Sequence, residues 1–198
     1  EPNGLLKDDA ITYLVPAQNL RERGAFFDGD DRPEIARTPG YPAFLATLIF
    51  LFGKDLRVLL LAQAVVLSFG VLILYWIARR ILPPVTAFLA GLLAALSPWN
   101  AVLAGLPLAD GLFSLLVLAI LFSMRVTKEA KSLSGAALGS ASVGLFTGMA
   151  VLVKPIWPLV VLIAVCLYFL YGSERKRVWL IVAIMLFFAV GPSYLWVA

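Results

Sequence analysis

Long apolar runs separated by short basic clusters constrain this chain more than any other feature of its sequence. Six runs approach the roughly 20 residues that an α-helix needs to cross about 30 Å of hydrocarbon. They cover residues 58–78, 84–104, 108–124, 133–153, 156–172 and 178–197. With 62% hydrophobic and only 14% charged residues, the chain cannot be an ordinary soluble domain. The sequence therefore predicts an all-α membrane protein, folded as a polytopic helical bundle.

The charged residues predict how these runs are oriented. If all six cross the membrane, three basic joints fall on one side: Arg79-Arg80, then Arg125, Lys128 and Lys131, then Arg175-Lys176-Arg177. Basic joints mark the cytoplasmic face. The opposite face receives residues 1–57, which hold nine of the 12 acids. We therefore expect an integral, multi-pass protein of a bacterial or archaeal cell membrane, with an external loop over 1–57 and a bundle of about six helices over 58–198.

A seventh apolar run, residues 41–52, is too short to cross the membrane. At 1.5 Å per residue, a helix of that length covers roughly 18 Å. We place it at the membrane interface, as one of the juxtamembrane helices of the external loop. Because an external head must be delivered and anchored, and because the chain begins at Glu1 and stops inside an apolar run, it is expected to be a fragment of a longer protein.

Composition also excludes several kinds of chemistry. The chain contains no His, so Ser-His-Asp triads and HExxH zinc sites are impossible. Cys166 is the single cysteine, so there is no internal disulfide framework. The bases lie beside apolar runs and not on one polar face, which argues against nucleic acid as a partner despite the net charge of +4. Acid–base chemistry must therefore use carboxylates, Lys or Tyr.

The head begins with a segment, residues 9–23, that is typical of an amphipathic helix. Asp8 or Asp9 can cap it and Gly24 can end it. Its expected apolar side consists of Ile11, Leu14, Val15 and Leu20. Asp9 and Tyr13 are four residues apart, so they share one side of the helix.

A rigid turn follows, in which Pro39 and Pro42 fix the backbone. It brings Arg37 and Tyr41 to the start of the interfacial run. A carboxylate can take a proton from an acceptor hydroxyl, and a cation can stabilise a departing phosphate. The head therefore offers the groups needed at a site for a lipid-linked phosphate.

Four motifs, in order, resemble a known family. They are Asp9-Ala-Ile-Thr-Tyr13, Arg37-Thr-Pro-Gly-Tyr-Pro42, Leu106-Pro-Leu-Ala-Asp110-Gly-Leu-Phe113 and Gly148-Met-Ala-Val-Leu-Val-Lys154-Pro155. Together they look like the C-type glycosyltransferase superfamily, especially family 39 and its dolichyl-phosphate-mannose protein mannosyltransferase-like relatives. The resemblance implies a GT-C-like fold. It also implies inverting transfer of a sugar from a polyprenyl-phosphate-linked donor to a protein, lipid or glycan acceptor.

The resemblance also implies roles for individual residues. Asp9 matches the catalytic base of the family, and Asp8 is the adjacent alternative. Arg37 matches the residue that contacts the carrier phosphate. Tyr13, Tyr41, Asp110 and Lys154 are further substrate-binding candidates. Ala10 stands where many relatives carry Glu, which leaves the use of a divalent metal open, and no other cofactor is expected.

Two features of the bundle complete the prediction. Gly135, Gly139, Gly144 and Gly148 include small-xxx-small spacings that allow close approach of helices. The runs themselves are almost free of ionisable groups, whereas ion-coupled transporters place such groups near the midplane. The glycosyltransferase is therefore favoured, and a transporter, a flippase or a non-catalytic membrane assembly subunit is the alternative.

Overall fold

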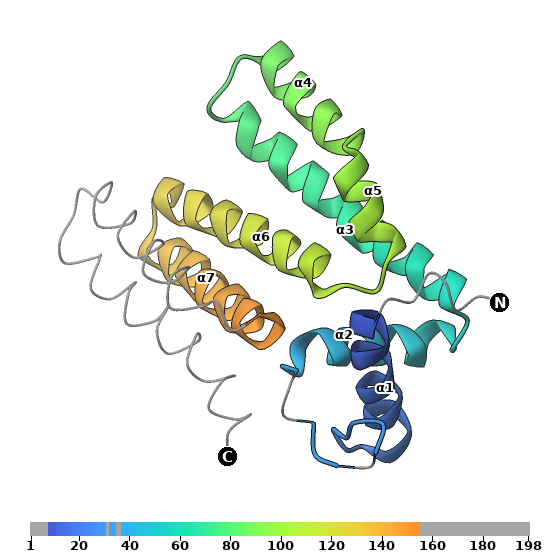
Figure 1. The fold of residues 1–198 in the computed structure, drawn as a ribbon. Coiled ribbons are helices and arrows are strands. Elements are labelled where there is room, and N and C mark those ends of the chain that lie inside the picture. The colour runs from blue at the N-terminus through green and yellow to red at the C-terminus, as the bar shows by residue number, and fades with distance from the viewer. Residues whose placement is uncertain (1–7, 31, 35–36, 155–198) are drawn as a thin grey trace. The chain divides into compact units, whose positions relative to one another are not determined.

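The computed structural model describes residues 8–30, 32–34 and 37–154, with the side chains of Asp8 and Asp9 outside the described part. Seven helices occur in these ranges (Figure 1): α1 Asp8–Arg23, α2 Gly40–Phe52, α3 Leu56–Arg79, α4 Pro84–Ala95, α5 Pro98–Gly105, α6 Ala109–Glu129 and α7 Leu133–Val153. The expected all-α class is confirmed. The runs expected at 156–172 and 178–197 lie outside the described residues.

The chain divides into two compact units, Glu1–Leu115 and Leu116–Ala198. The first contains α1 to α5 and the first turns of α6. The second contains the rest of α6 together with α7. Each unit is described by itself below.

Helix α1 packs against α2 in the first unit. Its buried residues are Ala10, Tyr13, Pro16 and Ala17, which are at most 9% exposed. Ile11, expected on the buried side, is 47% exposed, so that prediction was wrong. The small residues in this set allow the two helix axes to approach, whereas Leu14, Val15 and Leu20 are half-buried. The helix ends as expected at Gly24, which has a φ of +66°.

Helix α2 is the short apolar helix that was expected at residues 41–52. It buries Tyr41, Leu45 and Ile49 and contacts both α1 and α3. Gly53 ends it with a φ of +83° and donates its N–H to the Ile49 carbonyl at 2.9 Å. Because α2 has 13 residues, it is about 20 Å long. It cannot cross a bilayer as a straight helix.

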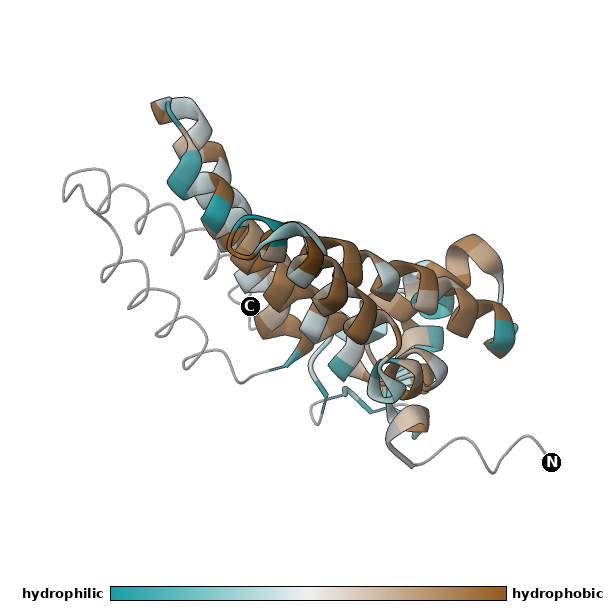
Figure 2. Ribbon diagram, turned by 90° about the horizontal axis from the view of Figure 1, so that it is seen from above, coloured by the Kyte–Doolittle hydropathy of each residue, from teal (hydrophilic) through white to brown (hydrophobic). Residues whose placement is uncertain are grey.

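Helix α3 has the length and composition of a membrane span. Asp55 caps its start by accepting a hydrogen bond from the Arg57 N–H at 2.8 Å. A stripe of large apolar side chains along it is more than half exposed: Leu61, Val65, Phe69 and Leu72. Such a stripe suits contact with lipid and not with water. Figure 2 shows the same pattern more widely, with apolar residues along the helices and hydrophilic ones mainly near helix ends and connections.

The run at 84–104, expected as one span, consists of two helices. Helices α4 and α5 are bent by 45° at Leu96-Ser97. Pro98 disfavours helical angles at the preceding residue, and Ser97 is indeed extended, with a ψ of 121°. The Asn100 Nδ2 donates to the Ala94 carbonyl at 2.7 Å across the break. In the described part of the chain, three helices are long and apolar enough to span, or four if the bent pair counts as one.

In the second unit, α6 and α7 meet closely at Gly139. A Cβ atom added there would collide with Thr127 Oγ1 and lie 3.1 Å from Thr127 Cα. Thr127 and Gly139 are both buried. The predicted close approach of helices at a glycine is therefore confirmed at this position.

Candidate functional site

The first contact of the candidate site joins Arg37 to Tyr13 of α1. The guanidinium carbon of Arg37 lies 4.8 Å from the centre of the Tyr13 ring. Arg37 Nη1 is 3.4 Å from Tyr13 Oη. That separation is long for an N–H···O hydrogen bond, so stacking of the cation on the ring is the stronger part of the contact. The structure thus brings together two residues that are 24 apart in sequence.

Side-chain hydrogen bonds hold the described backbone between the end of α1 and Glu34. Asn19 of α1 donates from Nδ2 to the carbonyls of Phe27 and Asp28, each at 3.1 Å. The Asp28 carboxylate accepts the backbone N–H groups of Asp30 and Arg32 at 2.8 and 2.9 Å. The Arg37 N–H in turn donates to Glu34 Oε1 at 3.1 Å. Side-chain bonds to the backbone therefore attach this acidic loop to α1 and orient Arg37.

Tyr41 extends the site from α1 into the core of the first unit. Its ring meets the Tyr13 ring edge to face, with centroids 5.1 Å apart and planes at 90°. Tyr41 is fully buried, and burial raises the pKa of its phenol above the ordinary value, with Tyr13 adding to the shift. Tyr41 is therefore a neutral donor, and it donates to Gln63 Oε1 at 2.6 Å.

Gln63 of α3 is a residue that sequence reasoning missed. It is 2% exposed, and its Nε2 donates to the carbonyls of Leu103 and Leu106 at 3.0 and 2.9 Å. The sequence does show a lone amide inside the apolar run 58–78. A buried amide must find hydrogen-bond partners, so this residue type could have indicated a role. Periodicity alone could not indicate which partners those are.

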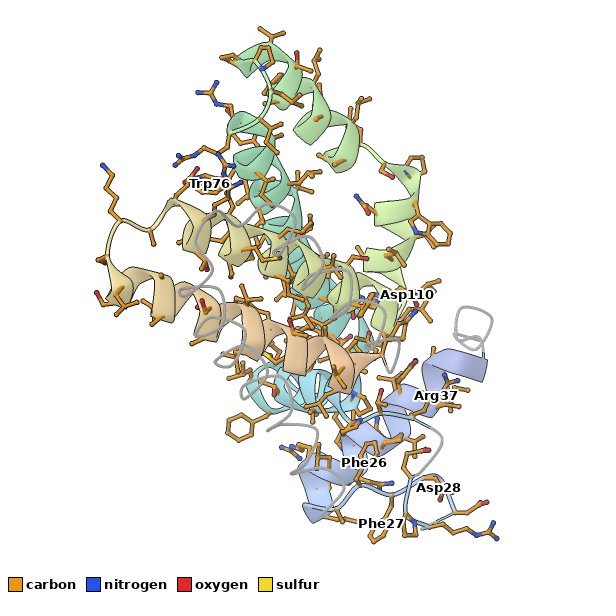
Figure 3. All side chains as sticks on the ribbon, turned by 90° about the vertical axis from the view of Figure 1, so that its left-hand side faces the viewer. Phe26, Phe27, Asp28, Arg37, Trp76 and Asp110 are labelled. Carbon is orange, nitrogen blue, oxygen red and sulfur yellow. The ribbon has the colours of Figure 1, made fainter. Side chains whose placement is uncertain are left out.

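The other predicted site residues have different positions. Asp110 lies in the first turn of α6. In Figure 3, Asp110 and Arg37 both lie well away from Trp76, whose ring is stacked under Arg80. Asp9 is the second residue of α1, one helical turn before Tyr13, and the side chains of Asp8 and Asp9 lie outside the described part. Lys154 ends α7 and belongs to the second unit. The assignment of these residues to a substrate site stays a prediction.

The remaining charged residues, at the end of α1, are exposed. Arg21 and Arg23 are exposed. Glu22 forms an ion pair with Lys54, which lies in the α2–α3 connection, and the hydrogen bond from Lys54 holds the pKa of that carboxyl below its usual range. Within the described ranges, no group of three or more His, Cys, Asp or Glu side chains could hold a metal ion.

The long apolar helices define the class, which is an integral membrane protein with several helices able to span the bilayer. A basic and aromatic group, formed by Arg37, Tyr13 and Tyr41, lies where α1 meets the short apolar helix α2. The family described as dolichyl-phosphate-mannose-protein mannosyltransferase matches residues 31–196 of the chain. The chain belongs to this family, and the resemblance seen in its motifs is confirmed.

Two solved structures share the fold. They are crystal structures of ArnT from Cupriavidus metallidurans, one in the apo state and one bound to undecaprenyl phosphate. Each matches with a TM-score of 0.77 and 20% sequence identity. The match covers 96% of this chain and 37% of that protein, so the chain spans well under half of its structural relative. A comparison with curated proteins finds no significant match.

Proposed function

We propose that this chain is part of an inverting membrane glycosyltransferase that moves a sugar from a polyprenyl-phosphate-linked donor to an acceptor hydroxyl. Arg37 stacked on Tyr13 is the observation that carries the proposal. This contact holds the Arg37 cation against α1, and Asp9 is the second residue of that helix. Membership of the mannosyltransferase family and the fold shared with ArnT support it.

In the proposed reaction Asp9 is the general base. Its carboxylate takes the proton of the acceptor hydroxyl as the hydroxyl oxygen forms a bond to the anomeric carbon. The bond from that carbon to the phosphate oxygen breaks, and its electron pair leaves with the phosphate. A single displacement of this kind inverts the configuration at the anomeric carbon.

Arg37 stabilises the charge that develops on the leaving phosphate. A guanidinium suits this role because its planar set of N–H donors matches phosphate oxygens and always carries its charge. The ring of Tyr13 beneath it restricts the plane of the fork. Asp110 and Lys154 are proposed as further substrate contacts, the former from the start of α6 and the latter from the end of α7.

The proposed site lies on the extracytoplasmic face. Arg37 belongs to the acidic head. Gln63, near the start of α3, bonds the α5–α6 connection, whereas Arg79 and Arg80 lie at the opposite end of α3. If the basic end of α3 is cytoplasmic, the head and the α5–α6 connection are outside. The proposed partners are therefore the lipid-linked donor in the outer leaflet and a protein, lipid or glycan acceptor.

The decisive experiment replaces Asp9 in the complete protein and measures two quantities. Asp9→Asn keeps the size of the side chain and removes the base, so sugar transfer from a polyprenyl-phosphate sugar in proteoliposomes should fall by at least about 100-fold. Binding of undecaprenyl phosphate should stay near that of the wild type. Asp30→Asn, an exposed acid in the same head, is the matched control and should retain full transfer.

Retained turnover in the Asp9→Asn variant would show that Asp9 is not the base. Substrate movement across the membrane without a covalent product, in the wild type itself, would instead support a transporter or flippase.

A further inference from the structure

The Gln63 side chain forms three hydrogen bonds, although it lies inside the apolar helix α3. A primary amide has two N–H donors and one carbonyl acceptor. Both donors are used, on the Leu103 and Leu106 carbonyls, and the acceptor takes the Tyr41 hydroxyl. Because an unpaired buried polar group is costly, these three bonds hold their partners firmly in place.

On one side Gln63 fixes the connection between α5 and α6. The last carbonyls of a helix have no partner within that helix. The Leu103 carbonyl, in the last turn of α5, and the Leu106 carbonyl, just after the helix, both accept hydrogen bonds from Gln63. The Leu106 carbonyl also accepts the Leu108 N–H at 2.8 Å. One turn further along α3, Leu67 lies so close to Gly111 that a Cβ there would be 2.6 Å from Leu67 Cδ1. The same face of α3 therefore holds both the connection and the first turn of α6.

On the other side Gln63 fixes the aromatic group of the head. Its Oε1 accepts the Tyr41 hydroxyl and so sets the direction of that group, and the buried Tyr41 ring packs at right angles to the Tyr13 ring. Tyr13 in turn lies under the Arg37 guanidinium. A continuous series of contacts thus runs from Arg37 through α1, α2 and α3 to the connection between α5 and α6.

We propose that Gln63 is a positioning residue that couples Arg37 in the head to the start of α6, so that both are presented to the lipid phosphate in one fixed arrangement. This inference rests on the proposed function, because it takes Arg37 as the phosphate contact. It assigns Gln63 no contact with substrate. Loss of the amide lets Tyr41 and the α5–α6 connection shift, and Arg37 then spends less time in the binding orientation.

The test measures the affinity of the complete protein in nanodiscs for undecaprenyl phosphate. Gln63→Met keeps the length of the side chain and removes all three bonds. We expect its affinity to fall about tenfold, the effect of roughly one unsatisfied buried group. Tyr41→Phe removes only the hydroxyl and should weaken binding by a smaller factor. The double variant should bind no more weakly than Gln63→Met, because the bond between the two side chains can be lost only once.

Two controls separate positioning from general stability. Ser68→Ala removes an exposed hydroxyl of α3 that bonds only the Ala64 carbonyl of its own helix, and it should bind like the wild type. Gly139→Ala destabilises the contact between α6 and α7 in the other unit. Its folded protein should keep wild-type affinity, even if its melting temperature falls as far as that of Gln63→Met.

The outcomes distinguish the two proposals. Wild-type affinity in Gln63→Met, with affinity lost in Arg37→Gln, would overturn the positioning role and leave the phosphate contact in place. Strictly additive losses for Gln63→Met and Tyr41→Phe would also overturn it. Wild-type affinity in Arg37→Gln would refute the phosphate contact itself. If Gln63→Met does not fold, Tyr41→Phe decides, and unchanged affinity in that variant counts against the coupling.

Discussion

Arg37 and Tyr13 form a stacked pair in which the guanidinium carbon lies 4.8 Å from the ring centre. Tyr13 is nearly buried, so the ring is a fixed platform and the cation is the more exposed partner. The position of the Arg37 guanidinium is therefore set by α1, the helix that also carries Asp9. Helix α1 thus carries the proposed base, Asp9, and also the ring that holds the proposed phosphate contact, Arg37.

Replacing Arg37 separates the effect of charge from that of shape. Arg37→Lys keeps the charge and loses the planar fork, so we expect undecaprenyl phosphate to bind about tenfold more weakly, and more weakly still in Arg37→Gln. Isothermal titration or a lipid-binding assay on the complete protein would measure this. Arg32→Lys, an exposed base in the same loop, is the control. If Arg37→Lys bound undecaprenyl phosphate as tightly as the wild type, the planar arrangement of guanidinium donors would have no role in binding.

Tyr13 should act through its ring and not through its hydroxyl. Because its contact with Arg37 Nη1 is 3.4 Å long, Tyr13→Phe should change lipid-phosphate affinity by less than about twofold. Tyr13→Leu removes the platform under the cation and the edge contact with Tyr41, and should weaken binding by about three- to tenfold. The same binding assay tests both variants. A larger loss in Tyr13→Phe than in Tyr13→Leu would contradict this view.

Tyr41 should make the fold sensitive to alkali. Its pKa is raised by burial, whereas in the unfolded chain a tyrosine releases its proton near about pH 10. Above that pH the folded state binds more protons than the unfolded state, so the free energy of unfolding falls as pH rises. Below it, this contribution to stability is fully present. Melting curves across this range should show a smaller alkaline loss in Tyr41→Phe than in the wild type.

The Tyr41→Phe variant should also be less stable at neutral pH, by about 1 kcal/mol, because the hydrogen bond to Gln63 is lost. If the stability of Tyr41→Phe and of the wild type fell by equal amounts above about pH 10, a role for Tyr41 in alkaline unfolding would be refuted.

Gly139 should tolerate no larger side chain. The Cβ of Gly139→Ala would meet both the side chain and the Cα of Thr127, and a backbone atom cannot move aside cheaply. We expect a loss of about 1–3 kcal/mol in the free energy of unfolding. Thermal unfolding in detergent would measure it. Gly105→Ala is the control, since a Cβ there has no heavy atom within 4 Å. Equal melting temperatures for the two variants would mean that α6 and α7 are not in close contact.

The sequence was most informative where local rules act alone. Apolar length predicted α3, α6 and α7, the positive φ of Gly24 follows from its place after the helix, and the short run at 41–52 is indeed one short helix. Proline chemistry indicates a break before Pro98, but the apolar run continues through it, so its length alone predicts a single span. The expectation for α1 was wrong at Ile11, which is exposed, because hydrophobicity alone does not decide which apolar residues of a helix pack against a neighbour.

By itself, then, the sequence determined the helical class, the membrane setting and the residue types available for chemistry, because these depend on composition and on spacing along the chain. Only the tertiary structure decided that Arg37 stacks on Tyr13, that Tyr41 bonds Gln63, and that Gln63 holds the end of α5. These contacts join residues 22 to 40 positions apart. Their partners are selected by which helix faces pack together, a property of the whole fold.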